Sequence, residues 1–354
     1  MQSHKLNDWI TEDKKIKDYM INLMIDTFDE ATMKYYYASI DEEKENTDVT
    51  NYNVEKPTTN FYECLFRVID YFLEGKELGI SEEVKEEIDQ LLDNFSLEVE
   101  KHNINSEEIR RALLLLDIKA FKNVNFPLDI ITPDAIGIIF ARLINAYFKD
   151  QKELLGVDYN FGVGNLMFTI KNHANADVHM IGMENHGLLA SVATHKANML
   201  DEPLEMHFQD ALEYHIYDID FATSDVAEYD YVNEEYHSYL FDKGINYFPY
   251  LLLEHDLTTE TPHTSFFLVN NKFFSHKDSV EFNHFLHEHG KIIALISLPL
   301  SFFQSEEDAK SIIILKNEPS SSKDMHIYML PEFANTQVFI KTLEEIEEYL
   351  KNLN

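Results

Sequence analysis

Residues 157–166, with the sequence VDYNFGVGNL, join a short apolar segment to two closely spaced glycines, and the apolar residues MFTI follow. This order predicts a strand, a tight loop and a helix. Gly162 and Gly164 allow positive φ angles and let a ligand approach the backbone closely. Amides at the start of a helix also lack intrahelical acceptors, so a ligand can use them. The stretch therefore predicts a ligand-binding loop.

The glycine pattern of this loop is incomplete. Met167 stands where the dinucleotide-binding pattern Gly-x-Gly-x-x-Gly has its third glycine. A plain structural turn is therefore the alternative to a ligand-binding loop, and the surrounding chain has to distinguish the two.

From Leu154 onward, strand-like apolar segments alternate with helical ones, which is typical of a doubly wound α/β sheet. The seven expected strands cover residues 156–159, 178–183, 204–208, 219–223, 265–269, 292–297 and 311–315. In such sheets ligands bind beyond the carboxyl ends of the strands near the topological switch, where residues 161–164 would lie. Residues 318–325, EPSSSKDM, predict a turn and an antiparallel hairpin after the seventh strand.

The first part of the chain predicts a separate helical domain. Its apolar residues recur at steps of three and four, as at Phe61, Leu65 and Val68, and no strand-like alternation is visible. We expect an N-terminal helical domain at residues 1–130, an α/β domain at 131–330 and a C-terminal segment with an amphipathic helix at 331–354. The helical domain serves substrate recognition or dimerisation, or it is a structural appendage.

Composition limits the partners of the chain. Its 354 residues are 45% hydrophobic, which indicates a globular protein, and 64 acidic against 29 basic residues give a net charge of −35. This charge disfavours DNA, so we expect either weak DNA binding or a protein partner. The single cysteine, Cys64, excludes an intrachain disulfide, and His284, His287 and His289 lack the spacing of a zinc motif, so no metal is expected. With no apolar signal core and no window of about 18 apolar residues, we expect a cytoplasmic protein without a membrane segment.

Acidic residues follow successive expected strands. Asp158 ends the first strand, and Glu184 follows the second at 20 positions beyond Gly164, near the offset at which an acid binds ribose hydroxyls. Asp210 follows the third strand and Asp225 the fourth. Each acid alone is more often a cap or turn residue, but four in register favour a binding site.

With these acids in place, residues 132–316 resemble the adenine-specific DNA methyltransferases, the S-adenosylmethionine-dependent class related to the modification subunits of type I restriction systems. Within it, stand-alone YtxK-like proteins are most similar. Residues 132–137, TPDAIG, resemble the Thr-Pro segment before the first strand, and they also predict a helix capped by Thr132 with Pro133 first. Residues 158–166 resemble Asp-Pro-Ala-x-Gly-Thr-Gly-Asn-Leu, and GME, QDAL and SD at 182–184, 209–212 and 224–225 follow at family spacing.

The resemblance implies a seven-stranded class I S-adenosylmethionine-dependent methyltransferase domain of Rossmann-like α/β fold, behind an N-terminal helical domain. It implies S-adenosyl-L-methionine as cofactor. The implied cofactor-binding residues, from the methionine part to the ribose and the adenine, are Thr132, Asp158, Gly162, Gly164, Glu184 and Asp210. The implied catalytic residues are Ser224, Asp225, Tyr229 and Tyr231.

The acceptor segment differs from the family pattern. Members of the family place a side-chain oxygen and a backbone carbonyl to accept the protons of an exocyclic adenine amine, and an aromatic ring stacks on the extruded base. Residues 224–231, SDVAEYDY, keep Ser224 and two tyrosines but have no proline. Three hypotheses stay open: an adenine methyltransferase, a catalytically inactive homologue that acts as a cofactor-binding or regulatory module, and a methyltransferase for a less anionic acceptor such as a protein amide.

Overall fold

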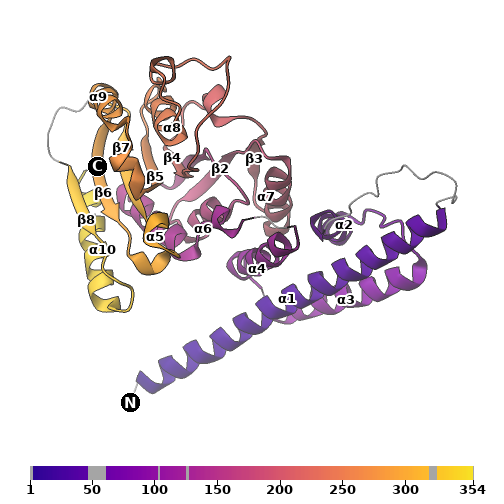
Figure 1. The fold of residues 1–354 in the computed structure, drawn as a ribbon. Helices are drawn as coiled ribbons and strands as arrows, with labels where there is room; N and C mark the ends of the chain where they lie inside the picture. Colours follow the sequence, from indigo (N-terminus) through magenta and orange to yellow (C-terminus); the bar gives the residue numbers. More distant parts are fainter. Residues whose placement is uncertain (1–2, 47–60, 103, 125–126, 319–324, 354) are drawn as a thin grey trace. The chain divides into compact units, whose positions relative to one another are not determined.

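The computed structural model of the protein describes residues 3–46, 61–102, 104–124, 127–318 and 325–353. The chain divides into two compact units (Figure 1). Unit 1 comprises Met1–Asp129 and Thr194–Glu202, and unit 2 comprises Ile130–Ala193 and Pro203–Asn354. The division at residues 130 and 330 that the sequence suggests stays a prediction. Among the described residues, no helix combines the length and the apolar character needed to cross a membrane.

Unit 1 is helical, as predicted. Its helices are α1 (Ser3–Asn46), α2 (Phe61–Glu74), α3 (Glu82–His102) and α4 (Ser106–Val124). The long helix α1 packs against the other three, and edge-to-face contacts of Phe28 with Phe72 and Phe95, at 5.5 and 5.7 Å, form part of the core. A buried ion pair between Lys196 and Asp117, 2.7 Å apart, adds a polar contact inside this unit.

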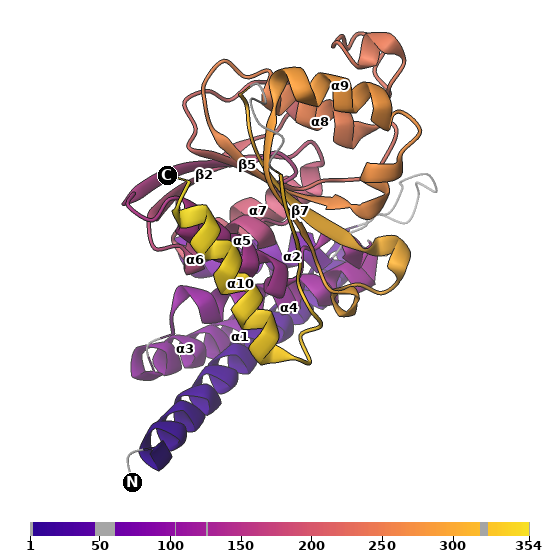
Figure 2. The ribbon, with the colours of Figure 1, turned by 90° about the vertical axis from the view of Figure 1, so that its left-hand side faces the viewer.

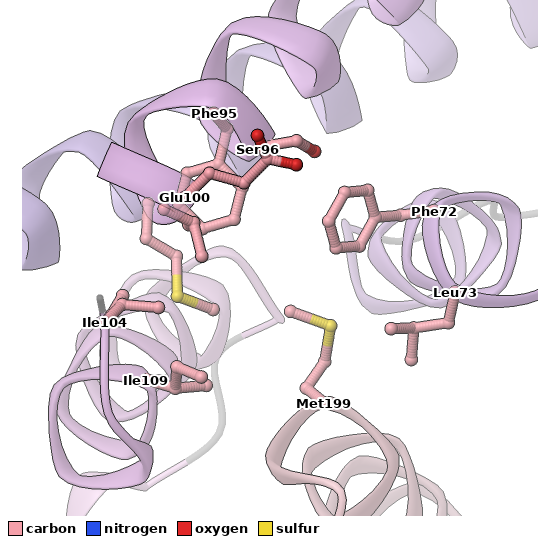
Figure 3. A pocket seen from close by; sticks show the side chains of 10 residues that line it. Phe72, Leu73, Phe95, Ser96, Glu100, Ile104, Ile109 and Met199 are labelled. Atoms are coloured by element: carbon pink, nitrogen blue, oxygen red, sulfur yellow. The ribbon is translucent and has the colours of Figure 1, made fainter. Parts of the chain in front are cut away.

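Unit 1 also contains an apolar cavity of about 270 Å³ (Figure 3). The cavity is lined by Met24, Phe72, Leu73, Phe95, Ser96, Val99, Glu100, Ile104, Ile109 and Met199. Of the two polar residues, Ser96 already donates its hydroxyl to the Leu92 carbonyl at 2.9 Å. Because a nucleoside needs several polar partners, this lining does not suit one, and the candidate site lies in unit 2.

Unit 2 is built on one sheet with the strand order β3-β2-β1-β4-β5-β7-β6-β8. The strands are β1 (Glu153–Asp158), β2 (Asp177–Met183), β3 (Leu204–His207), β4 (Phe221–Asp225), β5 (Thr264–Asn270), β6 (Lys291–Ser297), β7 (Lys310–Lys316) and β8 (His326–Met329). All neighbours pair in parallel except β7, which is antiparallel to both β5 and β6. The predicted doubly wound α/β fold is therefore confirmed.

Two details of the sheet differ from the sequence-based expectation. The sheet has eight strands rather than seven, and β8 pairs in parallel with β6 instead of forming an antiparallel hairpin with β7. Both edges of β7 are already paired, so the next segment cannot form a hairpin with it and instead joins the sheet at the free edge of β6. Residues 319–324 of the expected turn lie outside the described part of the chain.

Helices cover both faces of this sheet. They are α5 (Asp134–Tyr147), α6 (Asn165–His173), the start of α7 (Gly187–Leu200, which from Thr194 onward belongs to unit 1), α8 (Phe248–Leu257), α9 (Ser279–His289) and α10 (Thr336–Lys351). Short 3₁₀ helices are η1 (Leu128–Ile130), η2 (Ala211–Glu213), η3 (Phe241–Lys243), η4 (Asn271–Ser275), η5 (Leu300–Phe302) and η6 (Glu306–Asp308). Figure 2 shows α8 and α9 on one side of the sheet and α5, α6 and α10 on the other. The chain leaves β1 toward β2 and β3 and then returns to β4, so the topological switch lies between β1 and β4.

Candidate cofactor and acceptor site

The glycine loop connects the end of β1 to the start of α6 at the topological switch. Gly162 and Gly164 have φ angles of 55° and 77°, in the left-handed region that favours glycine. The amides of these two glycines, which precede α6, are already engaged. The amide of Gly162 donates to Glu184 Oε2 at 2.9 Å, and that of Gly164 donates to the Phe161 carbonyl at 2.7 Å. The loop therefore closes on itself and on the end of β2.

Glu184 directly follows β2 and lies beside this loop. Its Oε2 accepts from Gly162, and its Oε1 accepts from the amide of His186 at 2.7 Å. Burial raises the pKa of the carboxyl, while the backbone donors of His186 and Gly162 lower it. Each carboxylate oxygen keeps a further lone pair. Glu184 is thus a fixed acceptor that two neighbouring ribose hydroxyls can approach.

Asp158 is the last residue of β1 and is fully buried, with 0% exposure. Its Oδ1 accepts from the amide of Asn160 at 3.1 Å, whereas its Oδ2 has no hydrogen-bond partner among the described residues. Burial raises the pKa of this carboxyl to about 8, and the negative charges of Asp225 and Glu184 add to the effect. Directly before the glycine loop, β1 therefore ends in an acid whose burial favours the protonated form.

Ser224 lies in β4, where it is buried beside the same loop. Its hydroxyl donates to Asn160 Oδ1 at 2.9 Å. Because a hydroxyl has one proton, this contact leaves the lone pairs of Ser224 available as acceptors. Asn160 lies within the glycine loop, and the sequence alone predicted no role for it. Its partner Ser224 lies 64 residues farther along the chain.

Thr132 and Asp225 contact each other at the acceptor end of the site. The hydroxyl of Thr132 donates to Asp225 Oδ2 at 2.8 Å, and Lys310 donates to Asp225 Oδ1 at 2.5 Å. The predicted helix cap by Thr132 is therefore wrong: α5 begins at Asp134 with Pro133 as its N-cap, because the Thr132 hydroxyl bonds to β4 instead. Lys310 carries no sequence signal that links it to this site, since it simply begins an apolar strand.

Asp210 and the two tyrosines occupy the neighbouring edge of the sheet. Asp210 caps η2 through the Leu212 amide at 2.9 Å, and its Oδ2 accepts from the Tyr231 hydroxyl at 3.0 Å. Tyr229 lies parallel to the ring of Phe248, with centroids 4.5 Å apart, and is 42% exposed. Burial, followed by the charges of Asp210 and Glu184, raises the pKa of Tyr229. Tyr231 therefore bonds to Asp210, whereas Tyr229 offers a partly exposed ring.

These residues suit a nucleoside that carries a positive charge. Glu184 and Asp210 supply acceptors for ribose hydroxyls and for an adenine amine, and the unpaired Oδ2 of Asp158 supplies an acceptor for a cation. S-adenosylmethionine combines all of these groups. The contacts place the predicted cofactor and acceptor residues along one edge of the sheet, although their roles stay predictions.

Comparisons with known proteins agree with this architecture. No protein-family model matches the chain. It is 29% identical over 293 residues to the uncharacterized protein YtxK of Bacillus subtilis (strain 168), which covers 79% of this chain and 88% of that protein. It is similar in structure to a protein of Listeria monocytogenes described as a candidate class I S-adenosylmethionine-dependent methyltransferase, with a TM-score of 0.74, 23% identity and coverage of 94% of this chain and 100% of that chain.

A type I restriction-modification methyltransferase subunit from Streptococcus thermophilus is also similar, with a TM-score of 0.55, 11% identity and coverage of 98% of this chain and 93% of that chain. At these identities the likeness concerns the fold. The chain thus has the fold of the class I S-adenosylmethionine-dependent methyltransferases, extended by an eighth strand and preceded by helices.

Proposed function

We propose that unit 2 binds S-adenosylmethionine at the carboxyl ends of β1, β2 and β3 and transfers its methyl group to an exocyclic adenine amine. The contact of Glu184 with Gly162 carries this proposal, because it joins the acid that we expect to bind ribose to the glycine loop at 2.9 Å. Asp210 follows β3, where it can accept a proton of the cofactor's adenine amine. The similarity in fold to class I methyltransferases supports the same assignment.

The acceptor side provides the groups that such a transfer needs. An exocyclic adenine amine is a weak nucleophile, since its lone pair is delocalised into the ring. The Ser224 oxygen, oriented by Asn160, can accept one amine proton, and the exposed ring of Tyr229 can stack on an extruded base. Holding the amine in line with the sulfonium methyl then supplies much of the rate.

A second candidate is a cofactor-binding module without catalysis, and two observations favour it. The Tyr231 hydroxyl already bonds to Asp210, which ties the acceptor segment to the cofactor side. In addition, residues 203–242 of unit 2 contain no lysine or arginine, and Glu228 and Asp230 are exposed at the acceptor segment. Such a surface repels the phosphates of DNA.

A methyl-transfer assay combined with a binding measurement separates these candidates. Radiolabelled S-adenosylmethionine is incubated with duplex DNA, single-stranded DNA and protein extract, and its affinity is measured by titration calorimetry. We expect label in adenine that is lost in Ser224→Ala and kept in Ser275→Ala, an exposed serine in η4. Cofactor binding without transfer to any acceptor would favour the module. Failure of the wild-type protein to bind the cofactor would refute both candidates.

A further inference from the structure

Asp158 is an acid for which the described part of the chain provides no ion pair. It is fully buried at the end of the central strand β1, and its only described donor is the backbone amide of Asn160, on Oδ1. The second oxygen, Oδ2, faces no donor among the described residues. A carboxylate charge in this position would lose its hydration and gain only the one hydrogen bond from Asn160. A positively charged group beside Oδ2 would stabilise the ionised form of Asp158.

The neighbouring acids make a negative charge on Asp158 still less favourable. Glu184 lies after β2 and Asp225 ends β4, and both are acids that act on Asp158 electrostatically. A cation in this cluster is Lys310 on β7, whose ammonium group contacts Asp225 at 2.5 Å. His186 interacts electrostatically with Glu184. The ion pair of Lys310 is thus made with Asp225, and none is found for Asp158 among the described residues.

We propose that Asp158 holds a proton until a cationic cofactor binds, that cofactor binding releases this proton, and that Asp158 thereby favours S-adenosylmethionine over S-adenosylhomocysteine. This inference rests on the proposed function. On binding, the O–H bond of the Asp158 carboxyl breaks and the proton passes to the buffer. The resulting carboxylate then pairs with the positive charge of the ligand. S-adenosylmethionine has one positive charge more than S-adenosylhomocysteine, so it drives the release further.

The size of the effect follows from the pKa of about 8 that burial gives Asp158. At pH 7 about nine in ten molecules then carry the proton, so binding of S-adenosylmethionine should release up to about 0.9 proton. The same linkage predicts an affinity that rises about ninefold from pH 6 to pH 7 and levels off above pH 8. The rise for S-adenosylhomocysteine should be smaller.

Titration calorimetry of the full chain tests this coupling. Heats of binding for both ligands are measured at pH 7 in phosphate and in Tris, whose protonation enthalpies differ, and the difference gives the number of protons released. Release of close to one proton with S-adenosylmethionine, and of fewer with S-adenosylhomocysteine, supports the proposal. Binding without proton release would overturn it while leaving the proposed function intact, whereas no binding at all would refute the proposed function itself.

Two variants assign the proton to its residue. Asp158→Asn should bind S-adenosylmethionine without releasing the proton and with a flat pH profile, whereas Glu184→Gln should keep the release and lose affinity. The opposite pattern would assign the proton to Glu184 and overturn the proposal. If Asp158→Asn does not fold, two measurements on the wild-type protein still test whether binding releases a proton: the number of protons released and the pH dependence of the affinity.

Discussion

Replacing Glu184 should weaken the binding of S-adenosylmethionine strongly. The carboxylate lies beside the glycine loop and accepts from the amides of Gly162 and His186 at 2.9 and 2.7 Å. These two contacts hold it in a single orientation, so that its remaining lone pairs can receive the ribose hydroxyls. Glu184→Ala removes both acceptors for the ribose and leaves the two backbone donors without their partner.

The expected loss follows from the number of hydrogen bonds. A hydrogen bond to a charged group contributes about 1.5–3 kcal/mol, and Glu184 is only half-buried, so two ribose contacts together contribute about 2–4 kcal/mol. This corresponds to a roughly 30- to 700-fold weaker affinity for Glu184→Ala. Glu184→Gln should lose less, about tenfold, because its amide keeps one acceptor oxygen but turns a donor toward a backbone N–H.

Titration calorimetry with S-adenosylmethionine measures these affinities, and thermal unfolding reports whether each variant is folded. Glu205→Ala is the matched control, since Glu205 lies on β3, is exposed, and pairs only with His207 at 2.8 Å in the described contacts. It should bind like the wild-type protein. An unchanged dissociation constant for a folded Glu184→Ala variant would refute the placement of the ribose.

Three further predictions concern stability. Gly164→Ala should lower the free energy of unfolding by about 1–3 kcal/mol, because the added Cβ, at a φ of 77°, would lie 2.5 Å from buried aromatic rings. Lys196→Met should cost about 3–5 kcal/mol, because it leaves Asp117 buried without its cation. Burial lowers the pKa of His263, but its contact with Asp256 at 2.8 Å raises it more. The wild-type protein should therefore have a higher free energy of unfolding than His263→Gln. This difference is fully present below about pH 6.5, the pKa of His263 in the unfolded chain, and is lost as the pH rises through the higher pKa of the folded protein.

Urea denaturation checks all three. Gly244→Ala is the control for the glycine, since its φ is 83° but nothing lies within 4 Å of the added Cβ, and it should cost less than Gly164→Ala. The double variant Asp117→Leu with Lys196→Met should regain most of the lost stability. For His263, the prediction would be contradicted if the difference in free energy of unfolding between the wild-type protein and His263→Gln increased from pH 6 to pH 9.

Much of the α/β fold could be predicted because its central strands are buried on both faces. Such strands appear as continuous apolar segments. The strands predicted at 178–183 and 311–315 therefore differ from β2 and β7 by no more than one residue at either end. Tertiary contacts decide the rest. Helix α8, for example, begins only at Phe248, because Pro249 sets its first turn and Glu254 bonds to Ser238 and Leu240 before it.

The candidate site was predictable only where it follows chain order. Glu184 and Asp210 follow β2 and β3, Asp225 ends β4, and the carboxyl ends of parallel strands meet at one edge. Lys310 was not predictable, because β7 runs antiparallel and its first residue reaches the same edge only through pairing with β5. The bond between Tyr231 and Asp210 likewise depends on the path of the acceptor segment, which no local pattern specifies.

The most direct test of the central claim is a crystal structure of the protein grown with S-adenosylmethionine or S-adenosylhomocysteine. We expect the ribose hydroxyls at the carboxylate of Glu184, the adenine amine near Asp210 and the methionine part above Asp158. A ligand found in the apolar cavity of unit 1 instead, or no ligand at saturating concentration, would contradict the account.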